Sequence, residues 1–178
     1  MSEHDEREKL RSYLAAQSAK LSAADIRQRL EEAAAEFFAA VGRATDVAAR
    51  TPPAAGEWSV AEIVEHVALT LEDVTRIMRA MVDGRRPASP MSSHAPVNAG
   101  LPLADLVARL RSSHAAAAGL LEAQRGEPHT DLRVAESYFG EINWKGYALI
   151  LRLHYKDHAQ QVQKTLTQHG PVGSPTGP

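Results

Sequence analysis

The chain has 178 residues, 44% of them apolar, which is enough for one domain with a substantial core and too few for two comfortable ones. Its 20 Lys and Arg against 22 Asp and Glu give a net charge of −2, and no basic stripe with interleaved aromatic residues occurs, so we expect no nucleic-acid partner. There is no run of 18 apolar residues, and residues 2–8 are charged where a secretory signal would be apolar, so we expect a cytoplasmic protein with no membrane partner.

Two helices are predicted in the first fifty residues. Residues 3–19 carry few apolar side chains among many charges, which indicates a short, marginal N-terminal helix. Ser22, with Asp25 three residues later, resembles an N-cap signal, and apolar residues follow it at helical spacing. These residues are Ile26, Leu30, Ala33, Phe37 and Val41. We expect this first bundle helix to end near residues 45–49.

The second bundle helix has the best-marked start. Ser59 and Glu62 form a capping box, and Trp58 and Ile63 stand at the positions of a hydrophobic staple. The inward stripe that follows consists of Ile63, His66, Val67, Thr70, Val74, Ile77 and Met81. Gly84 then offers a left-handed cap at which the helix ends.

Residues 84–101 contain three prolines and two glycines and show no periodicity, which predicts a long connection. In a helical bundle, such a connection indicates that the helices on either side of it run in the same direction. A third helix follows, with Pro102 in its first turn and the stripe Leu103, Val107, Leu110, His114, Ala117 and Leu121. Residues 126–130 form a break, and residues 131–142 form either a loop or a short helix.

The fourth helix is expected from about residue 143 to residue 168, before Gly170 and Pro171. No segment shows the alternating pattern of a strand. Four helices without a sheet predict an all-α four-helix bundle in which a long crossover joins the second and third helices. We therefore divide the chain into an N-terminal helical extension (1–19), a bundle domain (20–170) and a disordered tail (171–178).

Eight histidines and no cysteine leave imidazole and carboxylate as the available metal ligands. His154 and His158 are four residues apart on the inward face of the fourth helix, where neighbouring Cβ atoms lie about 5–6 Å apart, so both rings can reach one ion. His66 lies on the inward stripe of the second helix. The pattern therefore predicts a three-histidine metal site, and the alternative is three core histidines that bind no metal.

Neighbouring residues receive lesser roles. Tyr155 stands where the zinc-protease motif has Glu, so a metalloprotease is disfavoured. His114 is interpreted as a core histidine, with a pocket-lining or fourth-ligand role as the alternative. Gln161 either orients a ligand ring or is an ordinary surface glutamine, and Trp144 and Tyr147 either pack the core or wall a pocket. Solvent-facing positions are expected for Glu62, Glu65, Asp157, His4, His94, His129 and His169.

Two stretches taken together resemble a known family. They are Gly56-Glu57-Trp58-Ser59-Val60-Ala61-Glu62-Ile63-Val64-Glu65-His66 and, far downstream, His154-x-x-x-His158-x-x-Gln161. The combination is similar to the DinB-like (damage-inducible) metal-binding four-helix bundle superfamily, over roughly residues 20–170. This resemblance implies an up-down-down-up bundle in which His66, His154 and His158 bind one divalent metal, often zinc or nickel. It also implies homodimers, and relatives that include thiol-cofactor-dependent S-transferases and a mycothiol-dependent maleylpyruvate isomerase.

The expected function is that of a metal-dependent enzyme acting on a small-molecule substrate, by transfer of a low-molecular-weight thiol or by hydrolysis. Three neutral imidazoles leave an open coordination position at which water or a thiol is activated near neutral pH. The rival hypothesis is a dimeric binding or stress-response module whose metal has no catalytic role. A pocket of a few hundred Å3 beside the rings favours the enzyme, whereas a ring cluster sealed by Trp144 and Tyr147 favours the module.

Overall fold

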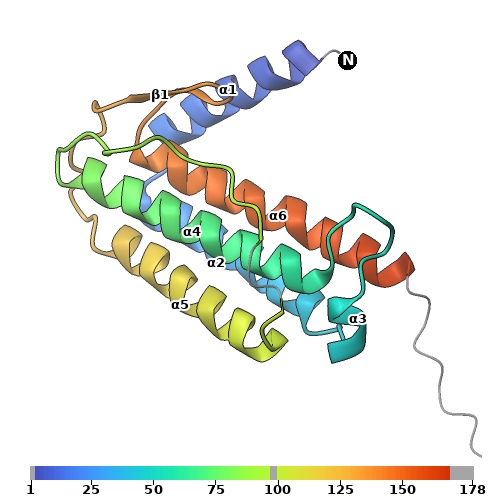
Figure 1. Ribbon diagram of the computed structural model, residues 1–178. Coiled ribbons are helices and arrows are strands. Elements are labelled where there is room, and N and C mark those ends of the chain that lie inside the picture. Colours follow the sequence, from blue (N-terminus) through green and yellow to red (C-terminus); the bar gives the residue numbers. More distant parts are fainter. Residues whose placement is uncertain (1–2, 97–99, 169–178) are drawn as a thin grey trace, which may run out of the picture.

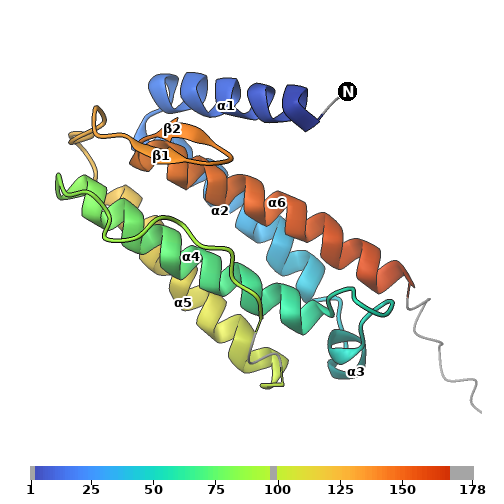
Figure 2. The ribbon, with the colours of Figure 1, turned by 45° about the horizontal axis from the view of Figure 1, so that its top comes forward.

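Four long helices form the body of the protein in the computed structural model, which describes residues 3–96 and 100–168 (Figure 1). They are α2 (Ala23–Val41), α4 (Val60–Val82), α5 (Leu103–Glu122) and α6 (Trp144–Gln168). Helices α2 and α6 run in one direction and α4 and α5 in the other, which gives the up-down-down-up order (Figure 1; Figure 2). The all-α four-helix bundle expected from the sequence is confirmed.

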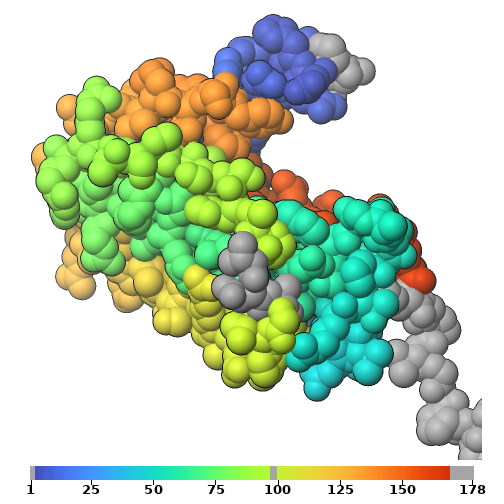
Figure 3. Space-filling model, viewed as in Figure 1, coloured from blue at the N-terminus to red at the C-terminus, as the bar shows by residue number. Residues whose placement is uncertain are grey.

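The connection after α4 returns along that helix before α5 begins (Figure 2). We call its described part, residues 84–96, the crossover loop. In the space-filling view this loop covers part of the surface of α4 (Figure 3). The loop must travel back along the bundle because α4 and α5 are parallel, as its length predicted.

Local capping signals set the helix boundaries. The hydroxyl groups of Ser22 and Ser59 accept hydrogen bonds from the backbone N–H groups of Asp25 and Glu62, the third residues of α2 and α4. The carboxylates of Asp25 and Glu62 in turn accept from the backbone N–H groups of the two serines, so both capping boxes form. Gly84 follows α4 with a φ of 74°, as predicted for its cap. Helix α2 ends at Val41, earlier than expected, because Thr45 caps a separate five-residue helix, α3 (Asp46–Arg50).

Helix α1 (Glu3–Lys20) confirms the N-terminal helix that the sequence predicted at residues 3–19. Leu14 on this helix is fully buried. Arg11 donates hydrogen bonds to the backbone oxygens of Ser137 and Tyr138, at 2.9 and 3.1 Å. Tertiary contacts therefore stabilise a helix whose own apolar stripe is weak.

A small antiparallel hairpin occupies part of the segment that was expected to be a loop or a short helix. Its strands are β1 (Val134–Glu136) and β2 (Gly140–Ile142), with Ala135 opposite Glu141. The expectation of no strand was therefore wrong, because strands of three residues carry too few alternating positions to be recognised. The hairpin lies between α1 and α6 and places Phe139, in its turn, near the candidate site (Figure 2).

The core lies between the long helices and is apolar. Phe37 of α2, Ile63 and Met78 of α4 and Leu151 of α6 are all fully buried there. Within residues 3–96 and 100–168, no helix combines the length and apolarity needed to cross a membrane. The tail predicted at 171–178 falls outside the described residues.

Candidate metal centre

Three histidine rings converge between α4 and α6. His66 comes from the first half of α4, and His154 and His158 come from one face of α6. The ring centroids are 4.9 Å apart for His66 and His154, 4.9 Å for His66 and His158, and 4.3 Å for His154 and His158. One nitrogen from each ring lies within 4.8 Å of the other two. The helical spacing of the sequence motif therefore brings the predicted ligands to a common point.

Two of the rings are held by hydrogen bonds that define their orientation. The Nδ1 of His66 lies 2.5 Å from the backbone oxygen of His94, in the crossover loop. The Nδ1 of His158 lies 2.7 Å from the side-chain oxygen of Gln161. Because a carbonyl oxygen only accepts, each ring donates through Nδ1 and keeps an unprotonated Nε2. Gln161 thus orients a ring, which was one of the two roles considered for it.

The third ring has a buried nitrogen without a partner. The Nε2 of His154 is inaccessible to solvent and makes no hydrogen bond within the described residues. A buried polar atom of this kind is costly unless a ligand satisfies it. Three imidazoles are also a familiar donor set for a divalent cation with one open position. The residues present therefore fit a metal ion.

The spacing of the nitrogens is close to that of a bound site. In a tetrahedral site, two nitrogens that each lie 2.0–2.1 Å from the ion are about 3.4 Å apart. The three donors lie within 4.8 Å of one another, so side-chain rotations must bring the nitrogens closer by up to about 1.4 Å to place all three on one ion.

Burial lowers the pKa of all three imidazoles, because their charged forms are poorly solvated there. The pKa of His154 is held well below its ordinary value by burial and by its neighbours His158 and His66. Burial lowers the pKa of His158 to about 4, against the opposing hydrogen bond to Gln161. Burial also lowers the pKa of His66. The three rings are therefore neutral at pH 7, the state that binds a cation.

A cavity opens beside the rings. It has a volume of about 250 Å3, and His66 and His154 form part of its wall. The remaining wall consists of Thr70, Met91, Ser92, Ser93, Phe139 and Ile150. A second cavity of about 350 Å3 shares Phe139, Ile150 and His154 with the first. The cluster is therefore accessible to a small molecule.

The side chains that were considered as a seal lie elsewhere. Trp144 and Tyr147 are fully buried, with the indole N–H donating to the backbone oxygen of Pro128 and the Tyr147 hydroxyl donating to Glu136. Both pack the core. The aromatic residue at the cluster is Trp58, whose ring centroid is 4.8 Å from that of His66 and 6.5 Å from that of His158. The sequence pattern predicted only a hydrophobic staple with Ile63 for Trp58, and no contact with the histidines.

The predicted exposure of the other histidines and of the nearby acidic residues is confirmed for some and wrong for others. His114 lies outside the cluster, with Nδ1 3.3 Å from the Tyr155 hydroxyl, as expected for a core histidine. The prediction that Glu65 faces solvent was wrong, because its side chain is fully buried on α4. His94 was also wrongly expected at the surface, because its ring lies 3.3 Å from Asp73 and is about one quarter exposed. The exposed positions of His4, His129 and Asp157 are confirmed, and His169 lies outside the described residues.

These observations define a class of protein, the four-helix bundle with a candidate three-histidine metal centre at one interface. The family model described as DinB superfamily matches residues 29–162, and the chain belongs to that superfamily. The crystal structure of TT2238, described as a four-helix bundle protein, is similar over 80% of this chain and 99% of that chain, with 21% identity and a TM-score of 0.62. This second likeness supports the fold alone. No curated protein matches the sequence significantly.

Proposed function

We propose that this protein is a metal-dependent enzyme in which His66, His154 and His158 hold one divalent cation, zinc or nickel. Its reaction would be transfer of a low-molecular-weight thiol to a small molecule, or hydrolysis of one. The observation that carries the proposal is the unpartnered, buried Nε2 of His154, a residue that also lines an open cavity. Membership of a superfamily that generally binds metals supports the same ligands.

A divalent ion held by three neutral imidazoles would supply Lewis acidity to a water molecule or a thiol near neutral pH. The residues of the chain supply orientation and selectivity. Gln161 and the backbone of His94 fix two rings through Nδ1. The cavity wall contains the hydroxyl-bearing residues Thr70, Ser92 and Ser93 beside two of the histidines. Its apolar residues are Met91, Phe139 and Ile150, so a small molecule with both polar and apolar parts fits it.

Metal analysis tests the ligands. Protein purified without a polyhistidine tag is expected to carry about one ion per chain, and the substitutions His66→Ala, His154→Ala and His158→Ala are each expected to abolish loading. His114→Ala is the matched control, because His114 is a partly buried histidine outside the cluster. Substoichiometric metal in the wild type that is unchanged in His66→Ala would remove the proposed site. Diffraction at the zinc and nickel absorption edges would identify the ion.

Turnover is tested separately on the loaded protein. One assay offers a low-molecular-weight thiol with an electrophilic aryl chloride, and a second offers an activated ester. Loss of product formation in His154→Ala, with the fold retained by circular dichroism, is the expected result for an enzyme. Stoichiometric metal without turnover in either assay would favour the dimeric binding or stress-response module. Homodimer formation and a cytoplasmic location remain predictions, to be checked by light scattering and by cell fractionation.

A further inference from the structure

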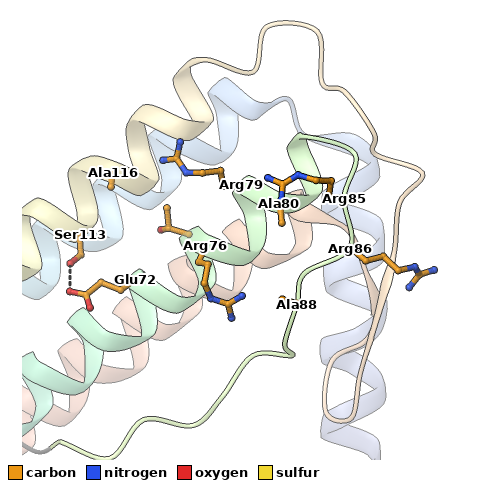
Figure 4. Close-up of a pocket in the computed structure, with 10 residues that line it drawn as sticks. Glu72, Arg76, Arg79, Ala80, Arg85, Arg86, Ala88, Ser113 and Ala116 are labelled. Carbon is orange, nitrogen blue, oxygen red and sulfur yellow. Dashed lines mark hydrogen bonds between the residues drawn. The ribbon is translucent and has the colours of Figure 1, made fainter.

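A further pocket, larger than both cavities beside the histidines, lies between α4, α5 and the start of the crossover loop. It has a volume of about 540 Å3, within the usual range for sites that bind small molecules. Small residues form part of its wall, namely Ala80 of α4, Ala88 of the loop and Ala116 of α5. We call it the α4–α5 pocket (Figure 4). Its walls leave room for an apolar group.

Arginine side chains dominate the rim of the α4–α5 pocket. Arg79 makes no ion pair or hydrogen bond through its side chain within the described part of the chain. Arg85 is paired with Asp83 at 2.8 Å, but both side chains are at least half exposed, and such pairs contribute little. Figure 4 shows Arg85 extending back along α4 towards Ala80 and Arg79, whereas Arg86 points away from them. Arg79 and Arg85 therefore each offer a guanidinium group to a ligand of the pocket.

The acidic residue of the pocket does not cancel this charge. Glu72 accepts two hydrogen bonds from Arg109, at 2.8 and 2.7 Å, and a third from Ser113 at 3.0 Å. The hydrogen bonds from Arg109 and Ser113 outweigh burial and lower the pKa of Glu72, so it stays ionised in its pair with Arg109. Arg76, also on the rim, is paired with Asp73, and Arg86 points away from the others (Figure 4). The cationic character of the rim is therefore left to Arg79 and Arg85.

A buried hydroxyl group in the wall has no partner. Thr75 is only 6% exposed, and its Oγ1 makes no hydrogen bond within the described residues. It is a wall residue of the α4–α5 pocket. A hydroxyl deprived of both solvent and partners is costly, and rotation of the Thr75 side chain towards a ligand in the pocket would satisfy it.

The pocket is separate from the metal centre. Thr75 and Arg79 follow His66 by nine and 13 residues on the same helix. At 100° per residue this places Thr75 on the side of α4 roughly opposite to His66, and at 1.5 Å per residue Arg79 is about 20 Å further along the helix axis. A ligand in the α4–α5 pocket therefore does not touch the three histidines.

We propose that the α4–α5 pocket binds a small organic anion with a carboxylate or phosphate group on an apolar body. The anionic group bridges the guanidinium groups of Arg79 and Arg85, which suit planar, multivalent recognition of such oxygens. The apolar body lies against the alanine wall, and Thr75 supplies one further hydrogen bond. The local backbone fixes Arg85, because its N–H donates to the Ala80 oxygen at 2.8 Å after the turn at Gly84.

Calorimetric titration of metal-free protein tests this proposal independently of the proposed enzyme. Phenyl phosphate and benzoate are the probes, and benzyl alcohol is the neutral comparison. At least one anion is expected to bind with a Kd on the order of 0.1 mM, and more weakly as salt is added. No binding of either anion up to several millimolar would overturn the proposal, as would equal binding of benzyl alcohol.

Matched variants locate the site. The double substitution Arg79→Gln with Arg85→Gln is expected to weaken anion binding about tenfold or more, because two charge-assisted hydrogen bonds are lost. Arg43→Gln, which removes an exposed arginine at the far end of α2, is expected to leave the Kd unchanged. Equal affinity of the double variant and the wild type would place the anion elsewhere and reject the site.

Thr75→Val separates a ligand-binding hydroxyl from a purely structural residue. Removal of an unsatisfied buried hydroxyl is expected to raise the Tm of the ligand-free protein, while anion binding weakens several-fold. A raised Tm with an unchanged Kd would exclude Thr75 from the site. His66→Ala is expected to bind the anion as the wild type does, so failure of the metal centre and failure of this pocket give different results.

Discussion

The backbone oxygen of His94 accepts a hydrogen bond of 2.5 Å from the ring of His66, so the crossover loop orients a candidate metal ligand on α4. Asp73, two turns further along α4, holds the loop in place. Its carboxylate accepts from the backbone N–H of Ser92 at 3.0 Å and lies 3.3 Å from the His94 ring. Helix α4 thus positions its own histidine through the loop that returns over it, which gives Asp73 an indirect role in the metal centre.

Replacement of Asp73 by Ala is expected to lower metal affinity about tenfold, although Asp73 belongs to no ligand set. The reason is that the loop loses the acceptor for Ser92 and the partner of His94, so the His66 ring is less well oriented. Competition with a chromogenic chelator measures the change. Asp131→Ala is the control, since Asp131 is an exposed acid far from the loop in sequence. Identical affinities for the two variants would show that the loop does not orient the ligand.

Gln161 allows a graded test of ring orientation on α6. Gln161→Leu removes the acceptor from His158 Nδ1 and is expected to weaken metal binding about tenfold. Gln161→Glu restores an acceptor of greater strength, so its affinity should equal or exceed that of the wild type. The same chelator competition gives both values. An equal loss of metal affinity in the Leu and Glu variants would show that the hydrogen bond between His158 and Gln161 does not determine metal binding.

The parts of the fold that sequence predicts are those fixed by local chemistry. Ser22 and Ser59 mark helix starts because a capping box needs only residues three apart. The length of the connection after α4 predicts parallel helices because a short loop cannot span the bundle. The hairpin at 134–142 was missed because strands of three residues have too few positions to show an alternating pattern.

In the candidate site, too, the sequence predicts the features that local helix geometry fixes and misses those that depend on tertiary contacts. His154 and His158 share a face by helix geometry, and the apolar stripe placed His66 inward, so the three residues could be named from spacing alone. The contacts of His94 and Trp58 could not, because they depend on the path of a loop and on the angle at which a chain enters a helix. Glu65 was misplaced because a residue next to the inward-facing His66 was expected to point elsewhere, whereas burial on α4 extends further round the helix than the predicted stripe.

Glu127 joins two helix starts, and its removal should show a clear pH dependence. One carboxylate oxygen accepts from the N–H of Ala23 and the other from the buried Lys145, both at 2.8 Å. These bonds outweigh burial, which opposes ionisation, and lower the pKa of Glu127 from its ordinary value of 4.5. Glu127→Gln is therefore expected to reduce the free energy of unfolding by about 1–2 kcal/mol at neutral pH.

The sign of the pH effect follows from the lowered pKa. The unfolded chain binds a proton at Glu127 at higher pH than the folded chain does, so the stabilisation is complete above pH 4.5 and is lost as the pH falls through the lower folded pKa. Urea unfolding of wild type and Glu127→Gln across this range measures it. The stability difference should shrink on acidification, and a constant difference would show that the charge of Glu127 is not responsible.

Two glycines offer the same substitution with opposite expected signs. Gly84 has a φ of 74°, and a Cβ there would lie 3.0 Å from the His129 ring, so Gly84→Ala incurs both backbone strain and a steric clash. It is expected to reduce stability by about 1–2 kcal/mol and, because the turn fixes Arg85, to weaken anion binding in the α4–α5 pocket.

Gly119 lies within α5, and a Cβ there meets nothing within 4 Å. Gly119→Ala should therefore stabilise the protein by about 0.5–1 kcal/mol through helix propensity, as thermal unfolding would report. Equal shifts of the unfolding temperature in the two variants would show that the left-handed turn after α4 carries no strain penalty. Unchanged anion binding in Gly84→Ala would show that the turn does not set the position of Arg85.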